Sequence, residues 1–337
     1  MIARILAVLK ARNLEFIRDR SSMTWAIAMP FVLVFGLAIV FSGSDPDQFT
    51  VAVLDDAVAV EAHAHPFYAT RFIEFVPVED AAEAIRKVGR HQFDLLLASE
   101  PSMRYWVNPE SPRGYVVERL LLQADAAAER QVVTGEAVRY VDWLVPGILG
   151  MNIMFGCLFG VGYVVVRYRK NGFLKRLRAT PLSAFEFITA QAVSRLLLIL
   201  GVQIVVFLGV KLLLDISMEG SYFALFLVAL LGCSALISLA LVIAARIDSE
   251  ELAAGALNLC TFPMMLLSGV FFSLEGSPQW LQQLAAALPL TQILTAARAV
   301  MLDGAGVAAV VPQLIVLLAM TAVFLSVGSA LFRWRFI

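Results

Sequence analysis

One short polar stretch, residues 167–187, combines side chains that could bind a partner protein or an anionic surface. Its bases are Arg167, Arg169, Lys170, Lys175, Arg176 and Arg178. Phe173, Leu174 and Leu177 fall on one side of a short helix among these bases. A run of bases alone would hold the topology and touch anionic lipid. The added apolar side favours a surface that docks onto another protein.

The same stretch also specifies where its helix ends and where the next one begins. Thr180 precedes Pro181, and the residue before a proline is disfavoured in helical conformation. Ser183 and Glu186 have the S-x-x-E spacing of a capping box, which would start a second helix after Leu182. A loop that only sets topology needs bases but no such break and cap. A loop that only sets topology remains the alternative to a docking surface.

Four polar side chains interrupt stretches that are otherwise apolar: Asn152, Gln203, Asn258 and Ser268. Because an unpaired amide is costly among apolar groups, we expect hydrogen bonds between helices at these positions. The alternative is that they line a path for the polar part of a substrate. Across 196–214 and the other apolar stretches there is no central Asp or Glu, and Lys211, near the end of 196–214, is the only base. This pattern disfavours the proton or ion relay of a secondary transporter.

Histidines and cysteines give little sign of metal chemistry. His63 and His65 form an HAH pattern, but no acidic or cysteine partners accompany them at ligand spacing, so a polar loop is favoured. The three cysteines lie in apolar stretches, where they are expected to pack as small apolar residues. We therefore predict no metal site and no disulfide framework.

The elements that must position these residues are apolar helices long enough to cross a bilayer. The chain is 60% hydrophobic and only 16% charged, which is typical of an integral membrane protein. A span needs about 20 mostly apolar residues. We predict an α-helical polytopic membrane protein with six spans, at 23–41, 143–166, 190–214, 222–245, 252–272 and 307–332.

Charge placement predicts the orientation of these spans. Residues 1–22 and 167–187 are both rich in bases, and the positive-inside rule puts both in the cytoplasm. Six spans then return the C-terminus to the same side, so both termini are expected to be cytoplasmic. Residues 1–22 also have an apolar face, which predicts an amphipathic helix at the membrane surface. The stretch 23–41 is favoured as an uncleaved anchor over a secretory signal because it exceeds a usual signal core in length.

Residues 42–139 form a polar insert between the first two spans, large enough to be a domain. Strand-type runs at 50–54, 72–76, 93–97 and 103–107, with a helical stretch at 79–90, predict a small α/β domain outside the membrane. From Ser111 a helical pattern is expected to run through residue 133 towards the second span. Such a helix would couple the domain rigidly to the membrane.

Residues 275–304 are apolar but interrupted by Gln282, Gln283, Pro289 and Arg298, which argues against a seventh full span. Helical pieces that dip into the outer leaflet are favoured, because irregular backbone at membrane depth must be sheltered by protein or water.

Three segments together resemble the ABC-2 type transporter permeases. The segment KNGFLKRLRATPLSAFEFITAQ (170–191) is similar to the cytoplasmic loop of that family, with its basic part followed by T-P-L-S and a glutamate. YVDWLVPGIL (140–149) resembles the start of the second span, and PLTQILTAAR (289–298) resembles the Pro-Leu-Thr segment before the last span. Leu288 stands where family members commonly have Asn. With the order of one span, an outer domain and five spans, the resemblance covers nearly the whole chain.

The resemblance implies a permease subunit of an exporter in a bacterial inner membrane, moving a hydrophobic or amphipathic compound such as a lipid, glycolipid or drug. The loop would be the coupling helix seated in a cleft of a cytoplasmic ABC ATPase. The residues implied in this coupling are Phe173, Leu174, Lys175, Arg176, Leu177, Arg178, Thr180, Pro181, Leu182, Ser183 and Glu186. The outer re-entrant segment would include Pro289, Leu290, Thr291 and Arg298.

The chain is not expected to be an enzyme, since no G-x-x-x-x-G-K-[ST] motif is present to cradle ATP phosphates. It would bind no cofactor itself, and ATP and Mg²⁺ would be held by the partner ATPase pair. Further expected partners are membrane lipid, a second permease chain, identical or paralogous, and a periplasmic adaptor protein. The alternative function is a membrane-anchored sensor or scaffold whose outer domain binds a ligand or an adaptor. A secondary transporter or channel is less favoured.

Overall fold

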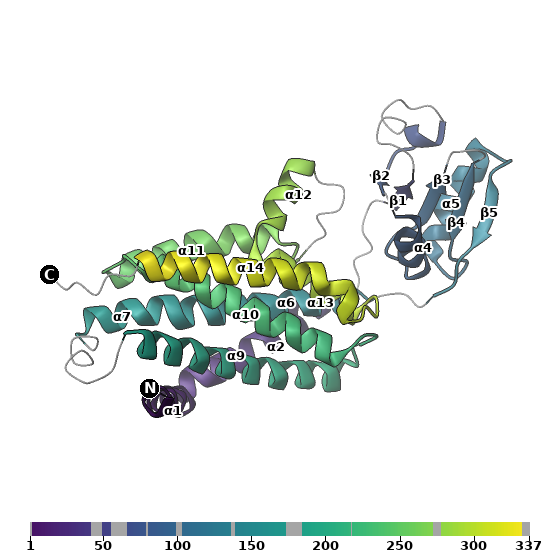
Figure 1. Cartoon of the computed structure of the whole chain (residues 1–337). Helices are drawn as coiled ribbons and strands as arrows, with labels where there is room; N and C mark the ends of the chain where they lie inside the picture. Colours follow the sequence, from purple (N-terminus) through teal and green to yellow (C-terminus); the bar gives the residue numbers. More distant parts are fainter. Residues whose placement is uncertain are drawn as a thin grey trace. The chain divides into compact units, whose positions relative to one another are not determined.

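The computed structural model describes residues 2–41, 49–54, 66–78, 80–98, 103–135, 139–172, 184–216, 218–271 and 278–331. The chain forms two compact units (Figure 1). A helical unit comprises Met1–Ile39, Val141–Leu274 and Gln279–Ile337. An α/β unit comprises Val40–Tyr140 with Glu275–Pro278.

Helices, several of them long and apolar, make up the helical unit (Figure 1). They are α1 (Ile2–Arg18), α2 (Arg20–Phe41), α6 (Tyr140–Cys157), α7 (Val164–Lys170), α9 (Ala184–Leu214), α10 (Tyr222–Ala244), α11 (Glu250–Leu267), α12 (Gln279–Ala286), α13 (Pro289–Met301) and α14 (Val307–Leu331). A π-helical turn, η2 (Leu158–Tyr163), joins α6 to α7. Ser221 and Ser249 begin α10 and α11 by accepting backbone N–H groups of the first turn.

Four of these helices are apolar and long enough to cross a membrane: Tyr140–Lys170, Thr189–Leu214, Tyr222–Ala244 and Val307–Leu331. The pair α12 and α13 would be a fifth if the two are taken as one span, but they are bent by 94°. The predicted stretches 23–41 and 252–272 also fall on helices, α2 and α11, which by themselves do not qualify as spans among the described residues. Four of the six predicted stretches therefore fall on helices that are apolar and long enough to cross a membrane.

The core of the helical unit lies around α10, which packs mainly against α14 and α13. Fully buried side chains here include Met154, Leu158 and Leu236. Gly232 of α10 allows close contact with α13, since an added Cβ would lie 2.6 Å from side-chain atoms of Ile293. Close helix contacts at small residues are typical of membrane proteins.

A five-stranded sheet of order β2-β1-β3-β4-β5 forms the α/β unit. Its elements are β1 (Phe49–Val53), η1 (Pro66–Ala69), β2 (Ile73–Pro77), α4 (Ala81–Gly89), β3 (Leu95–Ala98), β4 (Arg104–Val107), α5 (Pro112–Ala124) and β5 (Glu129–Val132). Strand β1 is parallel to β2 and β3, β4 is antiparallel to β3, and β5 is parallel to β4. The first four strands and α4 lie close to the predicted runs.

The predicted helix from Ser111 through residue 133 was wrong in its second half. Helix α5 ends at Ala124, and the Asp125 side chain accepts the N–H of Ala127 at 2.9 Å in the turn that follows. The chain then returns as β5, where Arg130 forms an ion pair with Glu118 of α5 at 2.8 Å. Pairing with the free edge of β4 thus outweighs the helix propensity of the alanines at 126–128. Helix α5 does not continue towards the second span.

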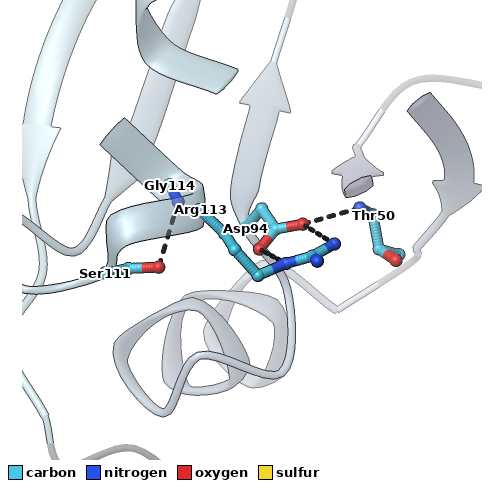
Figure 2. A network of polar contacts seen from close by, with 5 residues as sticks. All are labelled: Thr50, Asp94, Ser111, Arg113 and Gly114. Atoms are coloured by element: carbon cyan, nitrogen blue, oxygen red, sulfur yellow. Dashed lines mark hydrogen bonds and ion pairs between the residues drawn. The ribbon is translucent and has the colours of Figure 1, made fainter. Parts of the chain in front are cut away.

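A polar network joins the start of α5 to the sheet (Figure 2). The Asp94 carboxylate, which is 5% exposed, accepts the Thr50 N–H at 2.8 Å and two guanidinium N–H groups of Arg113. Ser111 caps α5 by accepting the N–H of Gly114 at 3.0 Å. At Gly114 an added Cβ would lie 2.8 Å from the Asp94 carbonyl oxygen, so the close approach requires glycine.

Candidate functional site

Most of the predicted docking loop lies outside the described residues. This holds for Phe173, Leu174, Lys175, Arg176, Leu177, Arg178, Thr180, Pro181, Leu182 and Ser183, as it does for His63 and His65. Glu186 is described. It lies in the first turn of α9 with its side chain 5% exposed, and its carboxylate is 3.7 Å from a guanidinium nitrogen of Arg4 in α1. The start of α9 is therefore in electrostatic contact with α1.

Helix α1 forms hydrogen bonds with the first half of α9. Arg12 donates from Nε to Oε1 of Gln191 at 2.9 Å, and Ser194 donates from Oγ to Oδ1 of Asn13 at 2.5 Å. The Arg12 guanidinium also lies 4.4 Å from the ring centre of Tyr168 in α7. Burial lowers the pKa of Arg12, while the nearby Glu15 carboxylate acts in the opposite direction. The helix predicted to lie on the membrane surface is thus attached to α9 and α7.

Helix α1 also exposes Leu6, Leu14 and Ile17, which are 56%, 40% and 52% exposed. An apolar face of this kind suits contact with lipid.

Helix α7, which precedes the docking loop, is anchored to the end of α10 by Arg169. Its guanidinium donates to the carbonyl oxygens of Ala244 at 3.1 Å, Ala245 at 3.2 Å and Ile247 at 2.5 Å. It also lies 3.5 Å from the Asp248 carboxylate. The last carbonyls of a helix have no partner within it, so a buried guanidinium here satisfies groups that would otherwise be left unbonded.

A second set of contacts ties the same segment to the start of α11. Tyr163 donates to the Glu250 carboxylate at 2.6 Å, and Lys170 lies 3.5 Å from Glu250 and 3.8 Å from Glu251. The carboxylates fall in the first turn of α11, where the helix dipole favours negative charge. The two helices that flank residues 173–183, α7 and α9, are therefore both joined by polar contacts to other helices of the unit.

A cavity of about 810 Å³ lies among α1, α2, α6, η2, α7 and α9, and we call it the α1–α9 cavity. Asn152, one of the predicted path residues, lines it. Arg12 and Arg195 line it as well. The cavity therefore combines guanidinium groups with the apolar side chains of membrane-length helices.

The other predicted path residues are not gathered around this cavity. Gln203 lines a separate, smaller cavity of about 240 Å³, and its Nε2 has no hydrogen-bond partner among the described residues. Asn258 is exposed on α11. Ser268 is buried and accepts a hydrogen bond from Thr291 of α13 at 3.0 Å, which is an interhelical bond of the kind expected.

The predicted outer segment forms the bent pair α12 and α13. Pro289 and the buried Leu290 open α13, and Leu288 at its N-cap makes no side-chain hydrogen bond. Arg298 donates to the carbonyl oxygens of Gly269 at 2.6 Å and Trp143 at 3.4 Å, and lies 3.8 Å from the Trp143 ring centre. Arg298 thus links α13 to α6 and to the segment after α11.

The sequence reasoning missed Arg12, Arg195, Arg169 and the pair of Tyr163 with Glu250. Arg195 lies inside the predicted span 190–214, just before the uncharged run from residue 196, and was assigned no role, whereas α9 continues unbroken from Ala184 and its span-length part begins at Thr189. A base inside a helix, flanked on both sides by apolar turns, was the signal that could have found it.

Comparison of the sequence with known proteins identifies its family. Residues 102–302, more than half of the chain, match the family described as "ABC-2 type transporter". The chain is 25% identical over 350 residues to the "Inner membrane transport permease YhhJ" of Escherichia coli (strain K12), covering 94% of this chain and 93% of that protein.

Two further relatives are more distant or less completely covered. One is the "Probable multidrug ABC transporter permease YbhR" of the same strain, 26% identical over 195 residues, which is 58% of this chain and 53% of that protein. The other is "ABC transporter G family member 20" of Dictyostelium discoideum, 24% identical over 343 residues, or 89% of this chain and 46% of that protein. The chain belongs to the ABC-2 type transporter family.

Proposed function

We propose that this chain is the permease subunit of an ABC exporter in a bacterial inner membrane, driven by ATP that a separate ATPase subunit hydrolyses. Membership of the ABC-2 family implies an ABC ATPase partner. The relatives named as an inner membrane transport permease and as a probable multidrug permease support the location and a transport role. ATP and Mg²⁺ would be bound by the ATPase, and the chain itself would carry no catalytic residue.

The coupling step is supported by the polar contacts that the two helices flanking residues 173–183 make with other helices. On one side, Arg169 joins α7 to the end of α10. On the other side, Gln191 and Ser194 join α9 to α1. An ATPase that moves this loop would displace α7 and α9, and these contacts would carry the movement to α1, α10 and α11. Such a linkage lets ATP binding bias the conformation of the membrane helices.

The lining of the α1–α9 cavity and the scarcity of charge in the membrane-length helices support the proposed substrate class. A cavity of about 810 Å³ with both apolar and guanidinium groups suits a compound that is partly apolar and partly polar. We therefore propose a hydrophobic or amphipathic cargo. The complex would contain a second permease chain, and the α/β unit would lie in the periplasm, where an adaptor protein could bind it.

Co-purification from the native host tests this proposal. The tagged full-length chain, solubilised in a mild detergent, is expected to bring down a protein with a Walker motif. Leu177→Glu, on the predicted apolar side of the loop, and Leu182→Glu, just after its predicted break, should each lower its recovery about tenfold or more. Val116→Glu in α5 is the matched control, because it makes the same kind of change at an exposed apolar residue of the α/β unit. Absence of any such ATPase, or equal recovery with all three variants, would overturn the proposal.

A further inference from the structure

The α1–α9 cavity has a charged part and an apolar part. Its charged and polar lining includes Arg12, Arg167 and Gln191, and its apolar lining includes Ile148, Met29 and Leu33. Arg195 faces Gly160, since a Cβ added to that glycine would lie 3.3 Å from the guanidinium carbon. From Gly160 to Ile148 the helix rises about 18 Å. The apolar lining therefore extends well beyond Arg195, as far as Ile148.

The guanidinium of Arg195 has no carboxylate within ion-pair distance in the described part of the chain. Its described contact is with the ring of Phe16 in α1, 5.3 Å from the guanidinium carbon to the ring centre. A cation removed from water is strongly destabilising unless an opposite charge or hydrogen bonds compensate it. The five N–H donors of Arg195 are thus a group that an anion would satisfy.

The other charges that line the cavity leave a positive excess near Arg195. Glu15 attracts Arg195, but it forms a 2.5 Å ion pair with Arg12, so two guanidinium groups share one carboxylate. Asp19 and Arg167 also line the cavity and balance each other in charge. The set of lining residues therefore carries one net positive charge, which a monoanionic group would neutralise.

The apolar part argues that the ligand is more than a small anion. Phe155, Phe159 and Leu198 line the cavity beside Arg195, and no ion or small polar solute gains from contact with them. Chains of apolar groups do gain, because burial removes them from water. The volume of about 810 Å³ lies in the range of sites that hold organic ligands of substantial size.

We propose that the α1–α9 cavity binds an anionic amphiphile of the membrane, with its phosphate or other acidic group on the guanidinium of Arg195, assisted by Arg12, and its apolar chain along Phe155, Phe159 and Leu198. This inference rests on the proposed function, since it names the class of compound that the same cavity would take. Binding to the permease chain alone tests it without the ATPase or any flux, so its failure can be told apart from failure of the transport function.

Binding of two fluorescent lipids to the purified full-length chain in a neutral detergent tests this proposal. The probes are short-chain phosphatidylglycerol, which is anionic, and phosphatidylcholine with the same chains. We expect the wild type to bind phosphatidylglycerol about tenfold more tightly, as a charge-assisted contact would give. Arg195→Gln should remove this preference. Lys10→Gln, the same loss of charge on the exposed face of α1, should keep it.

A preference that survives Arg195→Gln, or that Lys10→Gln removes equally, would overturn the proposal in favour of general surface electrostatics. Leu198→Trp covers the case in which Arg195→Gln does not fold. It keeps every charge but fills the apolar part, so it should weaken phosphatidylglycerol binding several-fold, and wild-type affinity in this variant would contradict the site. Glycerol 3-phosphate should displace the lipid only at far higher concentration. Displacement at equal concentration would show that the site binds free phosphate esters, and it would overturn the proposal that the ligand is an amphiphile.

Discussion

At the scale of single residues, Arg169 has the most consequential set of contacts. Its side chain is 7% exposed and satisfies the last carbonyls of α10. We predict that Arg169→Leu lowers the free energy of unfolding of the detergent-solubilised protein by about 1–3 kcal/mol, because buried carbonyls lose their donors. Lys170→Gln, at a side chain that is 49% exposed, should have a much smaller effect. The stability of both variants can be measured by heating the protein and monitoring the loss of its folded peak in size-exclusion chromatography. Equal effects of the two substitutions would contradict the capping role of Arg169.

In the α/β unit, Tyr105 predicts a dependence of stability on alkaline pH. Burial, with the hydrogen bond that Tyr105 donates to Glu118 at 2.9 Å, raises the pKa of Tyr105 to about 12. An unfolded tyrosine ionises near pH 10. The neutral phenol therefore contributes stability that is complete below pH 10 and is lost as the pH rises from about 10 to 12.

Comparison with Tyr105→Phe isolates this contribution. The variant should be less stable than the wild type at pH 9, and the difference should shrink as the pH approaches 12. Chemical unfolding at a series of pH values would show it. A difference that stays constant up to pH 12 would mean that Tyr105 does not titrate as the structure implies.

At the scale of elements, packing explains the glycine of the Pro-Gly pair at 146–147. Gly147 of α6 meets the segment after α11, since an added Cβ would lie 2.5 Å from the Val270 carbonyl oxygen. We predict that Gly147→Ala destabilises the protein by about 1–3 kcal/mol through overpacking, although alanine is the better helix former. Gly201→Ala in α9 is the control, because nothing lies within 4 Å of the added Cβ. The melting temperatures of the two variants test this prediction, and an unchanged value for Gly147→Ala would refute the close contact with Val270.

Elements were predictable from sequence where one local signal decides the outcome. Uninterrupted apolar length located α10 and α14. The serine and proline at 111–112 marked the start of α5. The end of α5 was not predictable, because β5 forms only through pairing with β4, which is a tertiary contact. The attachment of α1 was missed for the same reason, since Arg12 and Asn13 find their partners on α9, far along the chain.

At the scale of the whole molecule, the sequence motifs predicted the family, whereas the candidate site needed the structure. The T-P-L-S loop and the Pro-Leu-Thr segment point to an ABC-2 permease, and the family match agrees. The α1–α9 cavity combines side chains from α1, α2, α6, α7 and α9. No spacing along the chain encodes that combination, so Arg12 and Arg195 carried no recognisable motif.

The central claim is that residues 167–187 bind an ABC ATPase, and photo-crosslinking in the native host tests it most directly. A benzoylphenylalanine residue at position 177 or 182 is irradiated in intact cells, and the attached protein is identified by mass spectrometry. Position 116 in α5 serves as the control site. Positions 177 and 182 are expected to capture a protein with a Walker motif, and position 116 is not. Capture of lipid alone at 177 and 182, or of the same proteins at all three positions, would contradict it.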